Sequence, residues 1–301
     1  MLENIKNVRS DGFLGIRHEF PVSALQHVTC QTEAHKILRS KSFKGRKHER
    51  SEFCNLSFWS ADVSSDDIEK ARHQAYDTMR MVVKAEDLET FQEEMKEQFA
   101  NSPAFDKSAS RYGNFKFSFP LSFLLCRYKT QHCEGEEPQL RILGTDIYKQ
   151  EIAHYVVVHS PSTKIFNDLP KVSTTPNTFL NTSVYWMDET LYWRPESTSN
   201  SLQLRVSNNS CTVRKNEPQS KSKPLKKRPL LPRCVWNHLV LAFYLPMGGE
   251  LKISDEHLSR NLMPCHALQP FLNEDPIQKH QARQMIRAFK KDIKKVPLDS
   301  R

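Results

Sequence analysis

The chain has 301 residues, of which 38% are hydrophobic and 10% aromatic, enough to build a buried core, which excludes a wholly disordered chain. Only 8 glycines are present, which excludes glycine-rich repeats and disfavours loops that cradle phosphate groups. The net charge is +9, but residues 1–208 hold 26 basic and 27 acidic residues, whereas residues 209–301 hold 18 and 8. The basic excess lies in the last third, where it predicts either a solvated tail or attraction to a phosphate-bearing partner.

Nothing in the sequence predicts export or a membrane span. The N-terminus has no apolar core of the kind a secretion signal needs, and no run approaches 18 consecutive apolar residues. Seven cysteines are spread along the chain without a Cys-x-x-Cys pair. These features predict reduced thiols in a cytoplasmic or nuclear protein.

The first half of the chain predicts a mixture of strands and helices. Apolar and aromatic runs predict strands over 24–29, 55–63 and 112–119. Helical spacing of apolar residues predicts helices over 33–40, 64–83 and 86–99. Thr32 is expected to cap the helix over 33–40. Ser64 and Asp67, which have capping-box spacing, are expected to cap the helix over 64–83. The apolar piece 121–128 falls in a stretch that otherwise indicates strands.

The second half predicts further strands, a linker and a basic helix. A long strand is expected over 140–158, broken near Gly144, followed by a hairpin with arms at 184–186 and 191–193. Prolines and lysines indicate a linker over 209–233. After it we expect a strand over 235–245, a short helix over 254–262 and an amphipathic basic helix over 276–295.

Together these elements predict an α+β protein with a mixed or antiparallel sheet. Its divisions are a lead-in over 1–23, an α+β body over 24–208, a basic flexible linker over 209–233 and a C-terminal α/β segment over 234–301. The last segment is short for a core of its own, so it is expected to complete the main sheet.

Common catalytic and metal-binding motifs are absent from the sequence. There is no GxGxxG, P-loop, GxSxG or HExxH pattern, which removes the main support for nucleotide kinases, serine hydrolases and metalloproteases. Histidines and cysteines are plentiful, but no pair has the usual spacing of zinc ligands. We therefore expect no metal site.

One arrangement resembles a known fold. The segment LQHVTCQTEAHKILRSKSFKGR places His27 and Thr29 at the end of a strand, then a helix, then Phe-Lys-Gly-Arg. This resembles the opening of the ADP-ribosyltransferase-like fold, which poly-ADP-ribose polymerases share. The layout as a whole also resembles a group of vertebrate proteins abundant in fishes, a resemblance that implies no function.

The resemblance to ADP-ribosyltransferases implies that NAD is the cofactor. His27 and Thr29 would then bind NAD, Phe58 or Trp59 would line the nicotinamide side, and Glu151 would be catalytic. A carboxylate beside the apolar run 152–158 can grip a ribose hydroxyl and stabilise a developing oxocarbenium ion. An aromatic ring can stack on a flat cationic ring.

The same residues also fit structural roles. His27 can be a hydrogen-bonded histidine of the core or its rim, and Trp59 and Phe58 can be packing residues. Glu151 can form an ion pair, with three candidate partners: Arg141, Lys149 and Arg194. Arg194 can instead stack on its aromatic neighbours.

The basic region supports a second hypothesis, a non-enzymatic nuclear or cytoplasmic interaction protein. Residues 214–233 contain a lysine- and arginine-rich cluster that fits a nuclear localisation signal or contact with nucleic acid or a protein partner. The linker has no cluster of aromatic residues for base stacking. The helix over 276–295 can pack on its own domain, lie on a membrane or bind a partner.

Overall fold

The structure is a computed structural model. It describes residues 19–46, 54–80, 109–110, 113–148, 151–174, 184–194, 203–207, 210–214, 238–246, 248–267 and 277–295. The expected helix over 86–99 and the greater part of the expected linker lie outside these ranges.

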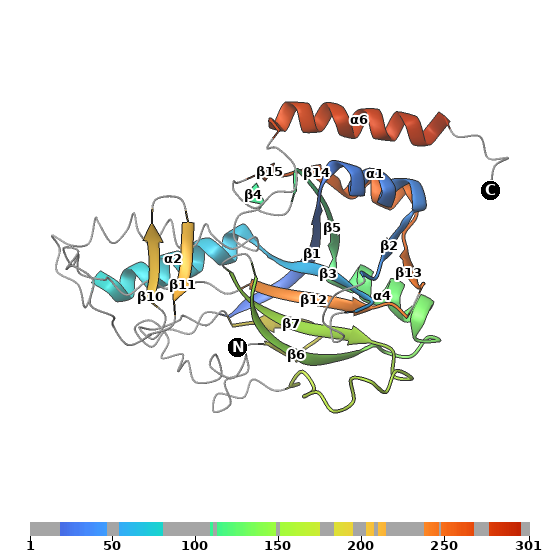
Figure 1. Cartoon of the computed structure of the whole chain (residues 1–301). Helices are drawn as coiled ribbons and strands as arrows, with labels where there is room; N and C mark the ends of the chain where they lie inside the picture. Colours follow the sequence, from blue (N-terminus) through green and yellow to red (C-terminus); the bar gives the residue numbers. More distant parts are fainter. Residues whose placement is uncertain are drawn as a thin grey trace.

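A curled mixed sheet forms the body of the molecule (Figure 1). Its strands lie in the order β14-β5-β1-β3-β12-β7-β6. In chain order they are β1 (Phe20–Thr29), β3 (Leu56–Val63), β5 (Phe115–Pro120), β6 (Gln139–Tyr148), β7 (Glu151–His159), β12 (His238–Tyr244) and β14 (Leu262–Pro264). Neighbouring strands are antiparallel except β7 and β12, which are parallel.

The central position of β12 ties the two ends of the sequence together. This strand pairs with β3 on one side and β7 on the other. Without it, the described sheet would separate into a β14-β5-β1-β3 part and a β6-β7 part. Strand β12 therefore shares one sheet and one core with β1 and β3.

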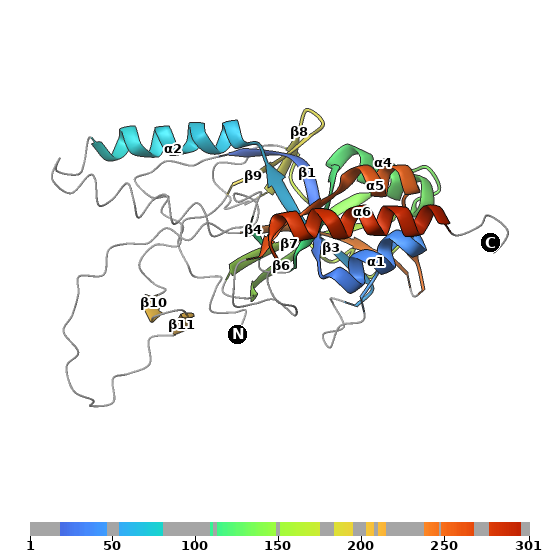
Figure 2. The ribbon, with the colours of Figure 1, turned by 90° about the horizontal axis from the view of Figure 1, so that it is seen from above.

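Five helices are described: α1 (Gln31–Ser40), α2 (Ser65–Arg80), α4 (Leu121–His132), α5 (Asp255–Asn261) and α6 (Lys279–Lys295). Helices α1, α4 and α5 contribute buried apolar side chains to the main core, against one face of the sheet. Helix α6 lies outside α1 and forms the outermost layer in Figure 1; seen from above in Figure 2, it runs between α1 and α5.

Shorter strand pairs complete the fold. The hairpin of β8 (Val184–Met187) and β9 (Thr190–Trp193) joins the start of β1. The other pairs are β2 (Ser42–Lys44) with β13 (Glu250–Lys252), β4 (Ala109–Ser110) with β15 (His266–Ala267), and β10 (Gln203–Ser207) with β11 (Ser210–Arg214). Strand β11 thus lies within the segment expected to be the start of the linker.

Three local predictions were wrong. Residues 121–132 form a helix, because Leu121, Leu124 and Tyr128 at helical spacing are buried together. The stretch 140–158 contains two antiparallel strands, β6 and β7, that pair with each other, and Gly144, with φ +149°, lies at a register shift within β6. The cap position of α1 is Cys30, so Thr32 lies inside the first turn.

Several predictions were confirmed. The hairpin arms at 184–186 and 191–193 pair, with Asp188 and Glu189 at positive φ in the two-residue turn. Ser64 caps α2: its Oγ accepts a hydrogen bond from the Asp67 amide at 3.1 Å. The α+β class with a mixed sheet is also confirmed, whereas an ADP-ribosyltransferase core remains a prediction.

Candidate functional site

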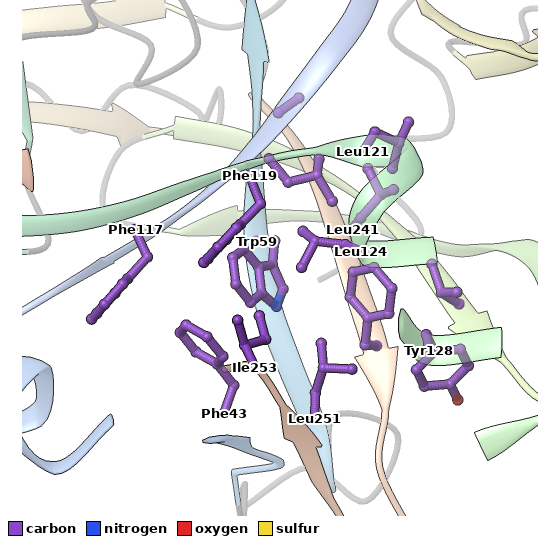
Figure 3. Close-up of a cluster of buried hydrophobic side chains, with 14 of the residues drawn as sticks. Phe43, Trp59, Phe117, Phe119, Leu121, Leu124, Tyr128, Leu241, Leu251 and Ile253 are labelled. Atoms are coloured by element: carbon purple, nitrogen blue, oxygen red, sulfur yellow. The ribbon is translucent and has the colours of Figure 1, made fainter. Parts of the chain in front are cut away.

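His27 lies on the core face of β1, inside a cluster of aromatic rings (Figure 3 shows its neighbours). Its Nδ1 donates to the carbonyl of Phe58 at 2.9 Å. Its ring contacts those of Phe43 and Trp59, at centroid distances of 5.1 and 5.2 Å. Burial lowers the pKa of His27, while the hydrogen bond to Phe58 opposes that shift in part. The structure therefore holds a neutral, packed imidazole here.

Trp59 is fully buried at the centre of the same cluster. Its ring packs between those of Phe43, Phe119 and Phe243, and its Nε1 donates to Ser57 Oγ at 3.1 Å. A side chain with 0% exposure presents no surface for stacking on a ligand. In this structure, the indole is part of the hydrophobic core.

Thr29 lies on the same face of β1 as His27, two residues further along, whereas the ring of Phe58 lies on the opposite face of the sheet. Thr29 is buried at the end of β1, where Gly113 approaches so closely that a Cβ at 113 would lie 2.0 Å from the Thr29 carbonyl oxygen. Phe58 is half-buried and packs against Tyr155 on the opposite face of the sheet. Adjacent strand residues point to opposite faces, so Phe58 and Trp59 do not line one pocket.

Glu151 opens β7 and is far from His27. Strand register aligns Gln26, Ser60, Val240 and Tyr155 across four strands. His27 lies one residue past this row and Glu151 four residues before it, so three strand spacings and five residues separate them, about 20 Å in all. The described sheet therefore does not bring the expected catalytic acid next to the expected NAD-binding histidine.

Arg141, one of the two arginines considered as partners of Glu151, has another role. Arg141 is buried and donates to the carbonyls of Asn167 and Leu169 at 2.9 and 2.8 Å, which holds the loop after β7 against the sheet. Lys149 lies outside the described residues.

Arg194 pairs with Glu19, and its guanidinium lies 4.7 Å from the centroid of the Tyr185 ring, not over the neighbouring rings on which stacking was expected. Burial and the Glu19 carboxylate raise the pKa of Tyr185 to about 12. This cluster fastens the β8–β9 hairpin to the start of β1.

Helix α6 differs from these buried clusters, because it has an apolar side that packs on the domain and a basic side that is exposed to solvent. Its apolar side chains Ala282, Ile286 and Phe289 are buried, and the Phe289 ring contacts those of His35 and Phe115 at 5.3 and 5.8 Å. This packing on the chain's own domain is one of the three roles predicted for the helix.

The other side of α6 is basic and open to solvent. Lys279, Arg283, Arg287 and Lys291 are exposed and follow each other at four-residue intervals. Cations at this spacing lie about 6 Å apart along one side of a helix. Within the described ranges, none of the four takes part in an ion pair. The sequence had indicated these cations, but not His280 and Gln284, which are exposed beside them.

The described residues hold neither a candidate metal site nor a candidate membrane-spanning helix. No group of three or more histidine, cysteine or acidic side chains there could hold a metal ion. No helix there is long and apolar enough to cross a membrane.

Comparisons with protein-family models, with curated proteins and with solved structures find no match for this chain.

Proposed function

We propose that this protein is an interaction protein that binds nucleic acid through the exposed basic side of α6. One observation carries the proposal: α6 is packed onto the domain by its apolar side, which leaves a row of cations, paired with no described acid, on the outermost layer of the molecule. A cationic row on a firmly held helix is suited to a polyanion, because the cations are arranged before the partner arrives.

The segment 214–233 would add to this attraction through its own lysines and arginines. The alternative hypothesis, an NAD-dependent ADP-ribosyltransferase, needs His27 and Glu151 in one site. The separation of about 20 Å that the register implies favours the interaction protein.

The proposal is tested by removing charge from α6. We expect the triple variant Lys279→Gln, Arg283→Gln, Lys291→Gln to bind a fluorescent nucleic-acid duplex at least tenfold more weakly than the natural chain. The slope of log affinity against log salt should fall by about 3, since each phosphate contact contributes close to one counterion.

The matched control removes three exposed lysines elsewhere, with Lys70→Gln, Lys164→Gln and Lys252→Gln. Both variants have the same net charge, so a general charge effect would weaken both equally. Equal weakening, or no binding by the natural chain, would overturn the proposal. Deletion of 214–233 would measure the separate contribution of that segment.

A further inference from the structure

The outward face of α6 can be identified from its buried face. The buried residues Ala282, Ile286 and Phe289 mark the inner side. At 3.6 residues per turn, the residues opposite them are His280, Gln284, Arg287 and Lys291. All four are exposed. The outward line of the helix thus carries hydrogen-bonding side chains and no apolar ones.

A second row of cations flanks this line. Lys279, Arg283 and Lys290 fall on the adjacent side of the helix, between the outward line and the packed face. Such an arrangement offers side chains for two kinds of contact, a central row for specific hydrogen bonds and a flanking row for charge.

The composition of this face argues against two other polyanionic surfaces. A helix that lies on a lipid surface inserts its apolar side chains among the acyl chains, but those of α6 are already buried against the domain. Binding of single-stranded nucleic acid relies on aromatic side chains that stack with bases. On α6 Phe289 is buried, so the small ring of His280 is the one aromatic ring of the helix exposed for such stacking. Double-stranded nucleic acid remains the polyanion that fits.

We propose that α6 lies in the major groove of double-stranded DNA, with Gln284 and Arg287 facing the base edges and Lys279 and Arg283 facing phosphates. This inference rests on the proposed function and narrows its ligand. The major groove of B-form DNA is wide enough to admit an α-helix. Arg and Gln are the side chains that pair with two major-groove atoms of guanine and adenine, respectively.

The outermost position of α6 makes this approach geometrically open. In Figure 1 the helix lies beyond α1, on the side away from the main sheet. Its 17 residues extend over about 25 Å, long enough to follow a groove past several base pairs. The major groove of an RNA duplex is deep and narrow, so the same face would not reach the bases there.

The test compares one mixed sequence in three duplexes: DNA, RNA, and DNA in which 7-deazapurines replace the purines and so remove the N7 acceptors of the major groove. For the full chain we expect the DNA duplex to bind about tenfold more tightly than the other two. Equal binding to all three would overturn the major-groove inference but leave the proposed function intact. Binding to none of them would overturn both.

A charge-neutral variant separates base contact from phosphate contact. Full-length protein is used to select its preferred duplexes from a random DNA pool. Gln284→Ala should lower the preference for the selected duplex over the starting pool about tenfold and leave the salt slope unchanged. The matched control is Gln278→Ala, near the start of the helix and off the outward line. No enrichment by the natural chain, or equal losses in the two variants, would contradict base reading by α6.

Discussion

The core face of the sheet around His27 and the outward face of α6 differ in whether their side chains are accessible to a ligand. The core face holds the residues whose sequence pattern most resembles a ligand site, but Trp59 is fully buried and His27 is locked to the Phe58 carbonyl. The outward face of α6 has the sequence pattern of an ordinary amphipathic helix, yet it holds exposed cations that pair with no described acid. Residue type alone does not separate a packed aromatic cluster from a binding site; access to solvent does.

The substitution Trp59→Ala tests this comparison with the largest expected effect, a decrease in the free energy of unfolding. We expect a loss of about 3–5 kcal/mol, because removing the indole leaves a cavity among Phe43, Phe119 and Phe243. Denaturant unfolding followed by circular dichroism measures the loss. Phe58→Ala, at a half-buried site on the opposite face, should cost less. Equal costs for the two variants would indicate that Trp59 is not the centre of the core.

The next effect concerns the attachment of α6. Phe289→Ala should lower the free energy of unfolding by about 3 kcal/mol, because the ring packs on His35 and Phe115. Ala288→Ser, a change at the exposed neighbour, is the control. A cost for Phe289→Ala no larger than that of the control would show that α6 is not held by its apolar side.

A smaller effect is the dependence of stability on pH. Burial holds the pKa of His27 below its ordinary 6.5, and those of His132 and His159 likewise. As pH falls through 6.5, the unfolded chain takes up protons before the folded chain does. The contribution of these histidines to the free energy of unfolding should therefore be complete above that pH. Below it, the free energy of unfolding should decrease by at most about 1.4 kcal/mol per pH unit for each histidine.

Urea midpoints between pH 7 and pH 5 measure this decrease. His27→Gln should make the dependence shallower, because the titrating ring is gone while an amide can still donate to the Phe58 carbonyl. Gln278→Ala, at an exposed position and with no titrating group, should leave it unaltered. An unchanged dependence in His27→Gln would contradict the burial of a neutral imidazole.

The stability of the charge variant of α6 should hardly change. Lys279, Arg283 and Lys291 are exposed and make no ion pairs with other described residues, so replacing all three with Gln should alter the free energy of unfolding by about 0.5 kcal/mol or less. Thermal unfolding checks this. A large loss would mean that these side chains serve the fold, and weaker nucleic-acid binding by the variant would then have a trivial cause.

The smallest expected effect is that of NAD. Because His27 is packed against other rings and the strand register places Glu151 about 20 Å from it, millimolar NAD or ADP-ribose should leave the melting temperature unchanged. A bound ligand at 100 times its dissociation constant would stabilise the fold by about 2.7 kcal/mol, which is easily seen. A shift that both His27→Ala and Glu151→Ala abolish would instead support the ADP-ribosyltransferase hypothesis.

Local features of the fold could be predicted from the sequence. The Ser64 cap, the hairpin at 184–193 and the amphipathic pattern of α6 each depend on neighbours within a few residues, and each was found as expected. The helix over 121–132 could also have been predicted, since its apolar residues recur at three- and four-residue spacing.

Long-range features could not be predicted in the same way. The insertion of β12 between β3 and β7 pairs residues that lie 180 to 188 positions apart on the β3 side, and no local pattern encodes such a register. The distance between His27 and Glu151 depends on that register. The distance between the residues of the candidate NAD site therefore could not be predicted from the sequence.

The central claim, that the outward face of α6 contacts nucleic acid, is tested most directly by photo-crosslinking. A photoreactive amino acid would replace Gln284 in one protein and Ile165, an exposed residue of the loop after β7, in another. We predict a crosslink to duplex DNA from position 284 that high salt abolishes, and none from position 165. Absence of a crosslink from position 284 under conditions where the chain binds DNA would contradict the account.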